Sequence, residues 1–170
     1  ATEKPFAKAA VDGIRNIVEK AGHSLSLLEK YTDVNDFYKA VADADALIVR
    51  SDKVTKEVID AAKQLKIVVR AGAGYDNLDL TACSAKNIVA MNTPGQNSNA
   101  VAELAIGMMI YMSRNTFKPG TGSELKGKKL GIHAYGNVGK LAADIAKGFG
   151  MEVFAYDPFV SADKIKAEGV

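Results

Sequence analysis

The chain has 170 residues, of which 48% are hydrophobic and 25% charged, a composition that predicts a folded core and argues against disorder. Its 22 basic and 20 acidic side chains leave a net charge of +2, which gives no reason to expect nucleic-acid binding. With one cysteine, two histidines and no apolar run near the roughly 20 residues that span a bilayer, we expect a soluble, cytoplasmic protein without a disulfide, metal or membrane contact.

The first 93 residues alternate between helical and strand patterns. Apolar residues at helical spacing, followed by Gly22, predict a helix over residues 11–21, and "LSLLE" at 25–29 has the composition of a strand. The rhythm continues with predicted helices at 33–44 (N-capped by Asp33), 55–65 and 80–87 and predicted strands at 46–50, 66–70 and 88–92. Because the strands are continuously apolar, we predict an α/β fold whose parallel sheet has helices on both faces.

The rhythm breaks at "NTPGQNSN", where Pro94 and Gly95 bar regular structure. The helix predicted next, over residues 100–115, is apolar nearly all round and must be buried on more than one side. It crosses between two domains, packs against another subunit, or forms the core of a single domain. The segment that follows, "TFKPGTGSELKGK", is typical of a linker, so we place a domain boundary near residues 94–120.

Residues 128–158 have the pattern of a βαβ unit, with a glycine turn between the first strand and the helix. The turn follows the three-glycine pattern of dinucleotide-binding proteins, with Ala134 in place of the first glycine. Gly136 would let the main chain approach a pyrophosphate, and Gly139 would let the helix pack closely on the strand. The alanine costs little if its φ is negative and more if its φ is positive.

About twenty residues past this turn, Asp157 ends the next predicted strand, where an acid hydrogen-bonds the ribose of NAD and repels the 2′-phosphate of NADP. The N–H groups of Asn137 and Val138, helped by the helix dipole, would hold the pyrophosphate. We therefore predict NAD as the cofactor; the alternative is a turn without a ligand. The predicted cofactor-binding residues of this unit are Ala134, Tyr135, Gly136, Asn137, Val138, Gly139, Asp157 and Pro158.

The chain resembles the NAD-dependent D-2-hydroxyacid dehydrogenases in four segments, which occur in the family's order: "RAGAGYDNLDL", "NTPGQNSNAVAELAIGMM", "GSELKGK" and "GKKLGIHAYGNVGK". The resemblance covers most of residues 46–160. It implies a flavodoxin-like substrate domain with a Rossmann NAD-binding domain inserted in it and an active cleft between the two. Residues 1–93 would then be the first part of the substrate domain, 94–120 an interdomain helix and linker, and 121–170 the first βαβ unit of the Rossmann domain.

Two arginines and one loop are the candidates for substrate binding. Arg50 and Arg70 end neighbouring strands at the carboxyl edge, where open α/β sheets bind ligands, and could hold a carboxylate or phosphate. Surface arginines without substrate contact are the alternative. In "RAGAG" the backbone N–H groups can turn toward an anion, and the resemblance implies that this loop holds the substrate carboxylate. The loop candidates are Gly72, Ala73 and Gly74.

The resemblance also implies that Asn97 and Ser98 line the cofactor side of the cleft. The family's catalytic arginine, glutamate and histidine would lie after Val170, so we assign no catalytic residue in this stretch and expect it to be inactive alone. Neither His23 nor His133 lies in a matching motif, and we expect His133 to be a packed imidazole at a strand end. Both ends of the chain lie in or beside helical patterns, and we expect a piece of a longer polypeptide.

Within the family, "LIVRSDKVTKEVIDAA" and "KIVVRAGAGYDNLDL" are most similar to members that act on D-3-phosphoglycerate. The implied reaction is its NAD-dependent oxidation to 3-phosphohydroxypyruvate, the first step of phosphorylated serine biosynthesis. The implied assembly is a homodimer formed through the 100–114 helix and the cofactor domain. Two alternatives stay open: a sister enzyme acting on glyoxylate, hydroxypyruvate or D-lactate, and a NAD-sensing binding protein of the corepressor type.

Overall fold

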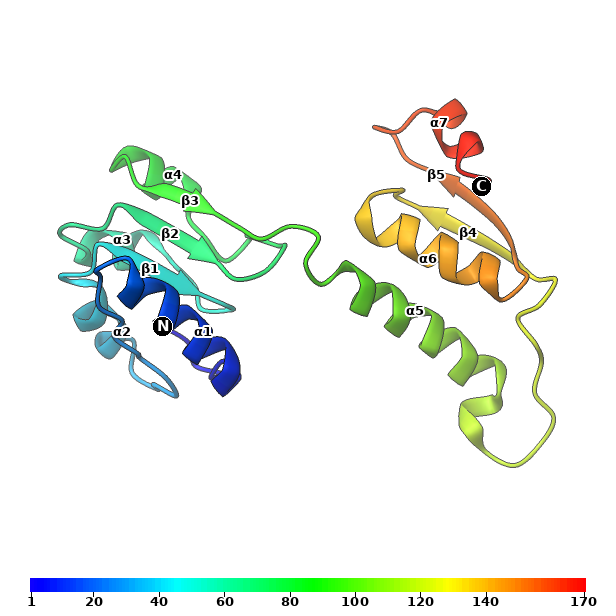
Figure 1. Ribbon diagram of the computed structural model, residues 1–170, viewed down its shortest axis with the longest axis horizontal. Coiled ribbons are helices and arrows are strands. Elements are labelled where there is room, and N and C mark those ends of the chain that lie inside the picture. The colour runs from blue at the N-terminus through cyan, green and yellow to red at the C-terminus, as the bar shows by residue number, and fades with distance from the viewer. The chain divides into compact units, whose positions relative to one another are not determined.

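The computed structural model describes residues 1–170 and divides into two compact units, Ala1–Pro94 and Gly95–Val170 (Figure 1). The division falls within the segment 94–120, where the sequence predicts a boundary. Each unit has its own parallel strands and its own hydrophobic core. The predicted α/β class with parallel strands is therefore confirmed.

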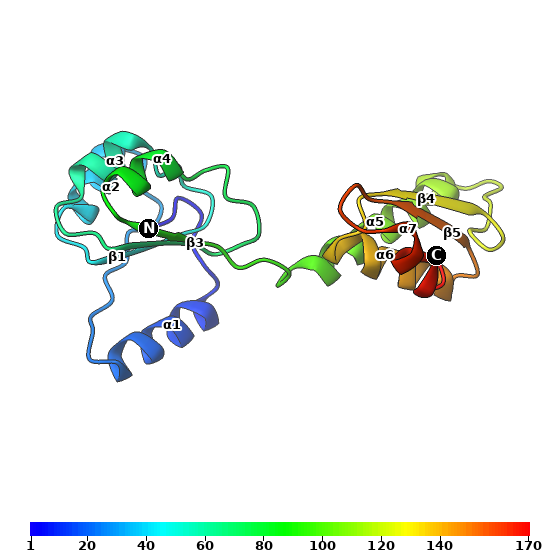
Figure 2. The same cartoon turned by 90° about the horizontal axis from the view of Figure 1, so that it is seen from above.

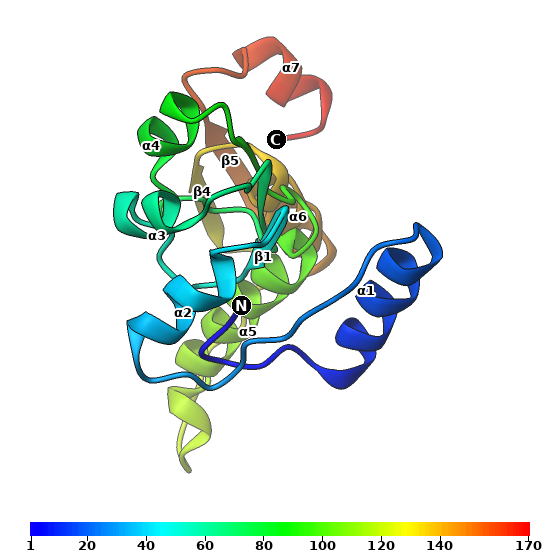
Figure 3. The ribbon, with the colours of Figure 1, turned by 90° about the vertical axis from the view of Figure 1, so that its left-hand side faces the viewer.

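The first unit is a three-stranded parallel sheet with helices on both faces. Its elements are α1 (Lys8–Lys20), α2 (Val34–Val41), β1 (Ala46–Val49), α3 (Lys56–Ala61), β2 (Ile67–Arg70), α4 (Leu80–Ala85) and β3 (Val89–Met91). The strand order is β1-β2-β3, so each strand is added beside the previous one through a helical crossover. Figure 2 and Figure 3 show α2, α3 and α4 on one face of the sheet and α1 on the other.

The core of this unit lies between the sheet and helices α2, α3 and α4. Side chains alternate along the strands, and Leu47, Val49 and Val68 point to this core and are buried. The helices contribute Phe37, Val41, Val58, Ile59 and Cys83. On the other face α1 has no buried residue, and Val89 and Met91 of β3 are 55% and 50% exposed. The two faces of the sheet are therefore unequally covered within these 170 residues.

Most predicted elements of this unit are present. Asp33 caps α2, where its side chain accepts the N–H two residues further on at 2.9 Å. The strand predicted at 25–29 is wrong, because this segment forms a single bridge, between Glu29 and Thr2. The pairing does not extend further, because the partner segment soon reaches Pro5, which has no N–H to donate, and then enters α1.

The second unit is a βαβ unit preceded by a long helix. Its elements are α5 (Ser98–Ser113), the 3-10 turn η1 (Asn115–Phe117), β4 (Lys129–His133), α6 (Asn137–Gly148), β5 (Glu152–Tyr156) and α7 (Ala162–Ala167). β4 and β5 pair in parallel along their whole length, as predicted. Ala143 and Ala146 of α6 are fully buried in a core with Ile106 of α5 and Val153 of β5, since their small side chains allow a close approach.

α5 is covered on one side only within this unit. It packs against α6, and its buried residues include Ala102 and Ile106. Its other side exposes Leu104 at 64%, Met108 at 59% and Met112 at 68%. The sequence predicts burial on more than one side, and within this unit the second side is exposed.

Candidate functional site

The turn from β4 into α6 contains the alanine that replaces the first glycine of the pattern. Ala134 has a φ of +90°, in the left-handed region that disfavours a residue with a Cβ. Its N–H donates to the C=O of Tyr156 at 2.8 Å, which extends the pairing of the two strands into the turn. The positive φ therefore destabilises the folded state by about 1–2 kcal/mol relative to an ordinary backbone conformation of alanine.

The other two glycines of the turn have different surroundings. A Cβ on Gly139 would lie 2.2 Å from the carbonyl oxygen of Ala134, so α6 packs on the turn at a distance that only glycine allows. A Cβ on Gly136 would meet nothing within 4 Å. Gly139 thus has the predicted packing role, and Gly136 leaves open space beside the main chain, where a ligand has room to approach.

Three N–H groups at the start of α6 have no acceptor in the protein: those of Asn137, Val138 and Gly139. The first bond at this end of the helix is donated by Lys140 to the C=O of Gly136, at 3.0 Å, and no side chain caps the helix there. The open N–H groups and the positive end of the helix dipole together favour an anion.

Asp157 follows β5 and fixes both the turn and its own loop. Its Oδ2 accepts the N–H of Tyr135, and its Oδ1 accepts the N–H of Phe159, each at 2.7 Å. These bonds, that from Phe159 first, lower the pKa of the carboxyl below its ordinary value of 3.8, so it is ionised at neutral pH. Each oxygen keeps a second lone pair, so the carboxylate can still accept a ribose hydroxyl.

Tyr135 is buried, whereas contact between its side chain and a cofactor would require an exposed side chain. The residue is 1% exposed, and its N–H is already donated to Asp157. Neither group is available to a ligand, whereas Pro158, directly after Asp157, is exposed. Tyr135 therefore belongs to the support of the turn and not to its binding surface.

The start of α5 lies against the same turn. Gly95 has a φ of +83°, and a Cβ there would lie 3.2 Å from Nδ2 of Asn137. Asn97 is the N-cap of α5, without a side-chain cap bond, and Ser98 is buried at 4% exposure. The N-termini of α5 and α6 are therefore neighbours, which brings Asn97 and Ser98 near the residues predicted to bind the cofactor.

In the first unit, the loop after β2 is shaped around the side chain of Arg70. A Cβ on Gly72 would lie 1.4 Å from Nη1 of Arg70, so the guanidinium occupies the space that a side chain at position 72 would fill. The Nε of Arg70 is buried without a hydrogen-bond partner. Because a buried donor is normally paired, this group is a candidate for binding an acceptor on a ligand.

Two of the three loop amides predicted to face an anion are free. The N–H of Gly72 donates to the C=O of Arg70 at 2.9 Å, whereas those of Ala73 and Gly74 have no acceptor in the protein. Asn92, directly after β3, holds the loop by donating its Nδ2 to the C=O of Ala73 at 2.7 Å. The sequence analysis missed Asn92, although a polar residue at the carboxyl end of the neighbouring strand is a usable signal.

Arg50 and Arg70 lie at the same edge of the sheet. Val49 pairs with Arg70 in the parallel register, so Arg50 follows one residue later on the adjacent strand. Arg50 is exposed. Its guanidinium is therefore accessible to a carboxylate or phosphate, the groups that arginine binds through two parallel hydrogen bonds.

Known proteins share both the sequence pattern and the fold of this chain. The model of the D-isomer specific 2-hydroxyacid dehydrogenase catalytic domain matches residues 7–165. The chain belongs to this family. Similar proteins include the hydroxypyruvate reductase of Thermotoga maritima, 39% identical over 91% of this chain and 53% of the relative, and D-3-phosphoglycerate dehydrogenase 2, chloroplastic, of Arabidopsis thaliana, 40% identical over 91% of this chain and 28% of the relative.

A solved structure is also similar: the NAD⁺-bound 3-phosphoglycerate dehydrogenase of Entamoeba histolytica. It is 55% identical, with a TM-score of 0.90, and the match covers 96% of this chain and 54% of that one. The chain spans about half, or less, of the length of these relatives. The resemblance to the 2-hydroxyacid dehydrogenases that the sequence indicates is confirmed.

The two histidines of this family member lie apart from any hydrogen-bonded catalytic arrangement. The ring of His133 packs beside that of Tyr156, with 5.6 Å between centroids, on the exposed side of the β4–β5 pair. His23 is exposed after α1. His133 is exposed, so the packed imidazole predicted at the strand end is realised only in its contact with Tyr156, and no catalytic role is assigned to either residue.

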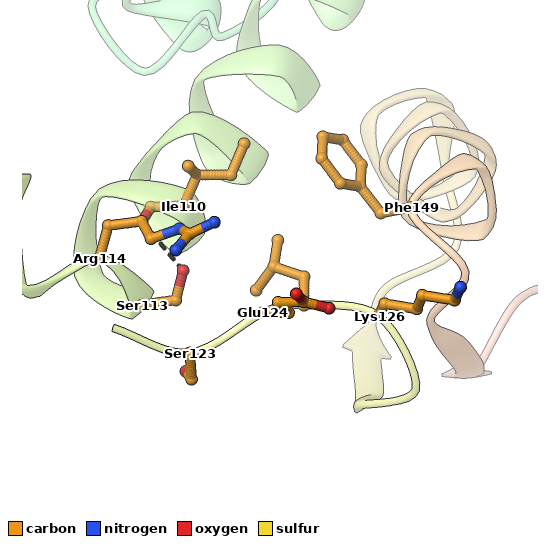
Figure 4. A pocket seen from close by; sticks show the side chains of 8 residues that line it. Ile110, Ser113, Arg114, Ser123, Glu124, Lys126 and Phe149 are labelled. Atoms are coloured by element: carbon orange, nitrogen blue, oxygen red, sulfur yellow. Dashed lines mark hydrogen bonds between the residues drawn. The ribbon is translucent and has the colours of Figure 1, made fainter. Parts of the chain in front are cut away.

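A surface cavity of about 240 Å³ lies at the opposite end of α6 from the glycine turn. The residues that line it are Ile110, Ser113, Arg114, Ser123, Glu124, Leu125, Lys126 and Phe149. Figure 4 shows their side chains, with the hydroxyl of Ser113 donating to the C=O of Ile110 at 3.0 Å. The 12 residues of α6 put this cavity roughly 18 Å from the turn, so it is separate from the predicted cofactor site.

No helix is both long enough and apolar enough to cross a membrane. No group of three or more His, Cys, Asp or Glu side chains is gathered in a way that could hold a metal ion.

Proposed function

We propose that the protein containing this chain oxidises D-3-phosphoglycerate to 3-phosphohydroxypyruvate with NAD⁺. The observation that carries the proposal is the open Gly136–Gly139 turn with Asp157 beside it, in a chain 55% identical to a 3-phosphoglycerate dehydrogenase solved with NAD⁺. The relative from Arabidopsis thaliana supports the phosphorylated substrate. Because the chain spans only part of these relatives, the activity is proposed for the whole protein.

The second unit would supply the groups that hold the cofactor. The free N–H groups at the start of α6 suit the pyrophosphate, and Gly136 leaves room for its approach. The ionised Asp157 suits the ribose hydroxyls and repels a 2′-phosphate, which favours NAD over NADP. Bound NAD⁺ would supply the acceptor for the hydride that leaves C2 of the hydroxy acid as its hydroxyl becomes a carbonyl and loses a proton.

The first unit would supply the groups that hold the substrate. The free N–H groups of Ala73 and Gly74 suit the carboxylate, and the unpaired Nε of Arg70 lies at the end of β2, directly before this loop. The exposed guanidinium of Arg50 suits the phosphate. This division of roles assigns binding and orientation to these residues and leaves proton transfer to residues outside the chain.

The proposal is tested with the full-length protein by following NADH spectrophotometrically. We expect NADH to form from D-3-phosphoglycerate and NAD⁺, and to be consumed with 3-phosphohydroxypyruvate in the reverse direction. No turnover in either direction, in a protein that melts cooperatively, would contradict it.

A second candidate is the reduction of hydroxypyruvate, favoured by the similarity to the Thermotoga maritima reductase. The two substrates differ by one phosphate, so the variant Arg50→Ala separates them. If Arg50 binds the phosphate, the KM for D-3-phosphoglycerate rises at least roughly tenfold, as for the loss of a charge-assisted pair, while the KM for hydroxypyruvate stays the same. Equal effects on both substrates would show that Arg50 does not bind the phosphate.

We also propose a cytoplasmic homodimer that uses α5. One side of this helix exposes three large apolar residues to water: Leu104, Met108 and Met112. Burying them against a second subunit would be favourable. The single Cys83 is buried and unpaired, which suits a reducing compartment. Sedimentation of the full-length protein tests the assembly: Met108→Glu should shift a dimer toward monomer, and a wild-type monomer would exclude it.

A further inference from the structure

The side chain of Tyr135 joins the glycine turn to α7. Its buried ring lies in the core of the second unit together with Ile165 of α7. Its N–H is held by Asp157, the residue proposed to grip the cofactor ribose. One residue of the turn is therefore fixed at its main chain by the end of β5 and at its ring by the helix that follows.

Glu168, directly after α7, contacts two lysines of α6, and one of these lies near the ring of Tyr135. Its Oε1 lies 2.7 Å from Nζ of Lys140, in the first turn of α6, and its C=O accepts Nζ of Lys147 at 2.9 Å. Nζ of Lys140 is also 5.4 Å from the ring centroid of Tyr135, within the range of a cation–π contact. Burial raises the pKa of the Tyr135 phenol, and the neighbouring Glu168 carboxylate raises it further.

We propose that Tyr135, Lys140 and Glu168, here called the α7 network, position the phosphate-binding N–H groups of α6 relative to Asp157. The inference rests on the proposed NAD function and adds to it residues that would act by positioning the turn. Ala134 has a left-handed conformation, which is maintained only where the surrounding structure holds it in place. The α7 network would hold the turn in this way.

Removing the charge of Glu168 distinguishes a positioning role from a purely electrostatic one, because the two predict opposite changes in the affinity for NAD⁺. Glu168 is a negative group near an anion site, so removing its charge should leave the affinity for NAD⁺ unchanged or raise it if charge alone matters. If Glu168 positions the turn, Glu168→Gln lowers the affinity instead. We expect the Kd for NAD⁺, measured by equilibrium titration of the full-length protein, to rise roughly three- to tenfold, as for the loss of one ion-pair contact in a partly exposed network.

A matched control lies on the same unit. Glu152 pairs with Lys129 at 3.8 Å, and Lys129 lies 5.8 Å from the ring centroid of Phe154, which repeats the arrangement of acid, lysine and aromatic ring away from the turn. Glu152→Gln makes the same chemical change and should leave the Kd for NAD⁺ as it is. Thermal melts of both variants show whether either has lost its fold.

Each outcome of these titrations either supports or overturns a proposal. A weaker Kd in Glu168→Gln, with wild-type affinity in Glu152→Gln and similar melting of both, supports it. An unchanged or tighter Kd in Glu168→Gln overturns it, as does an equal effect of both variants. If Glu168→Gln does not fold, Glu168→Asp keeps the charge but shortens the side chain that reaches Lys140, and a wild-type Kd in that variant counts against the network. Wild-type protein that binds no NAD⁺ refutes the proposed function instead.

Discussion

Two glycine-containing loops, residues 71–76 after β2 and residues 134–139 after β4, occupy equivalent places in the two units. Each follows the carboxyl end of a parallel strand and is held by a polar side chain from the end of the next strand. Asn92 donates to a carbonyl of the first loop, and Asp157 accepts an amide of the second. Both arrangements leave other N–H groups of the loop without a protein acceptor.

The loops differ in what their glycines make room for. Gly72 accommodates the guanidinium of Arg70, the mobile end of a side chain, whereas Gly139 accommodates the backbone carbonyl of Ala134. A side chain can move aside, but a backbone atom in a strand-to-helix turn moves only if the helix moves. The same substitution should therefore change a ligand-binding group in the first loop and the fold itself in the second.

Gly139→Ala is the substitution with the largest expected effect. The new Cβ would lie 2.2 Å from the oxygen of Ala134, so α6 must shift away from the turn. We expect a loss of about 3 kcal/mol in the free energy of unfolding, measured by denaturant titration, together with the loss of NAD⁺ binding.

Gly131→Ala provides its control, because a Cβ at this position in β4 would meet nothing within 4 Å. Its stability should change by less than about 1 kcal/mol. Similar losses in the two variants would show that the close helix contact is not what requires glycine at position 139.

Asp157→Asn tests the anchor of the second loop. The amide loses the charge that would hold the ribose, so the Kd for NAD⁺ should rise roughly tenfold or more. The folded state lowers the pKa of this carboxyl below 3.8, so its contribution to stability is present above that pH and is lost as the pH falls through the lower folded pKa. Acid unfolding below that pH should therefore be less steep in the variant than in the wild type.

Asn92→Asp is the corresponding change in the first loop. It replaces the donor to the C=O of Ala73 with an acceptor, which would repel that oxygen. We expect a higher KM for the hydroxy acid and an unchanged Kd for NAD⁺. A change in NAD⁺ affinity as large as that of Asp157→Asn would contradict the separate roles of the two loops.

The sequence was sufficient for the features that depend on local pattern. Continuous apolar runs identified β1, β2 and β4, and the spacing of glycines identified the turn before α6. The strand predicted at 25–29 is wrong although its composition suits a strand. A strand also needs a pairing partner, and the chain supplies one only at Thr2.

The remaining features depend on neighbours that are distant in sequence. Ala134 has its positive φ in a turn whose carbonyl oxygen lies against Gly139 of α6, and the inward place of the Tyr135 ring follows from where α7 packs. The role of Asn92 follows from the parallel register of β2 and β3. No local pattern contains this information, so the sequence alone named the binding loops but not their supports.

Gly72→Ala should have a moderate effect, confined to the substrate. The guanidinium of Arg70 must leave its present position, 1.4 Å from the new Cβ, while the backbone stays in place. We expect the KM for the hydroxy acid to rise roughly fivefold and the free energy of unfolding to change by less than about 1 kcal/mol. The double variant with Arg70→Met should be no worse than Arg70→Met alone, because both changes remove the same group. Additive effects would mean that Gly72 has a role apart from Arg70.

Ala134→Gly has the smallest expected effect and the opposite sign. Ala134 is held at a φ of +90°, which costs an L-residue about 1–2 kcal/mol, whereas glycine adopts it freely but gives up roughly 0.5–1 kcal/mol through its more flexible unfolded chain. The net gain in stability should be about 0.5–1 kcal/mol, measured by denaturant titration. The same exchange in the interior of α6, Ala142→Gly, should instead cost about 1 kcal/mol, since the helical conformation suits alanine. If both variants lose stability to the same extent, the turn does not hold Ala134 under strain, and the need that the α7 network meets would disappear with it.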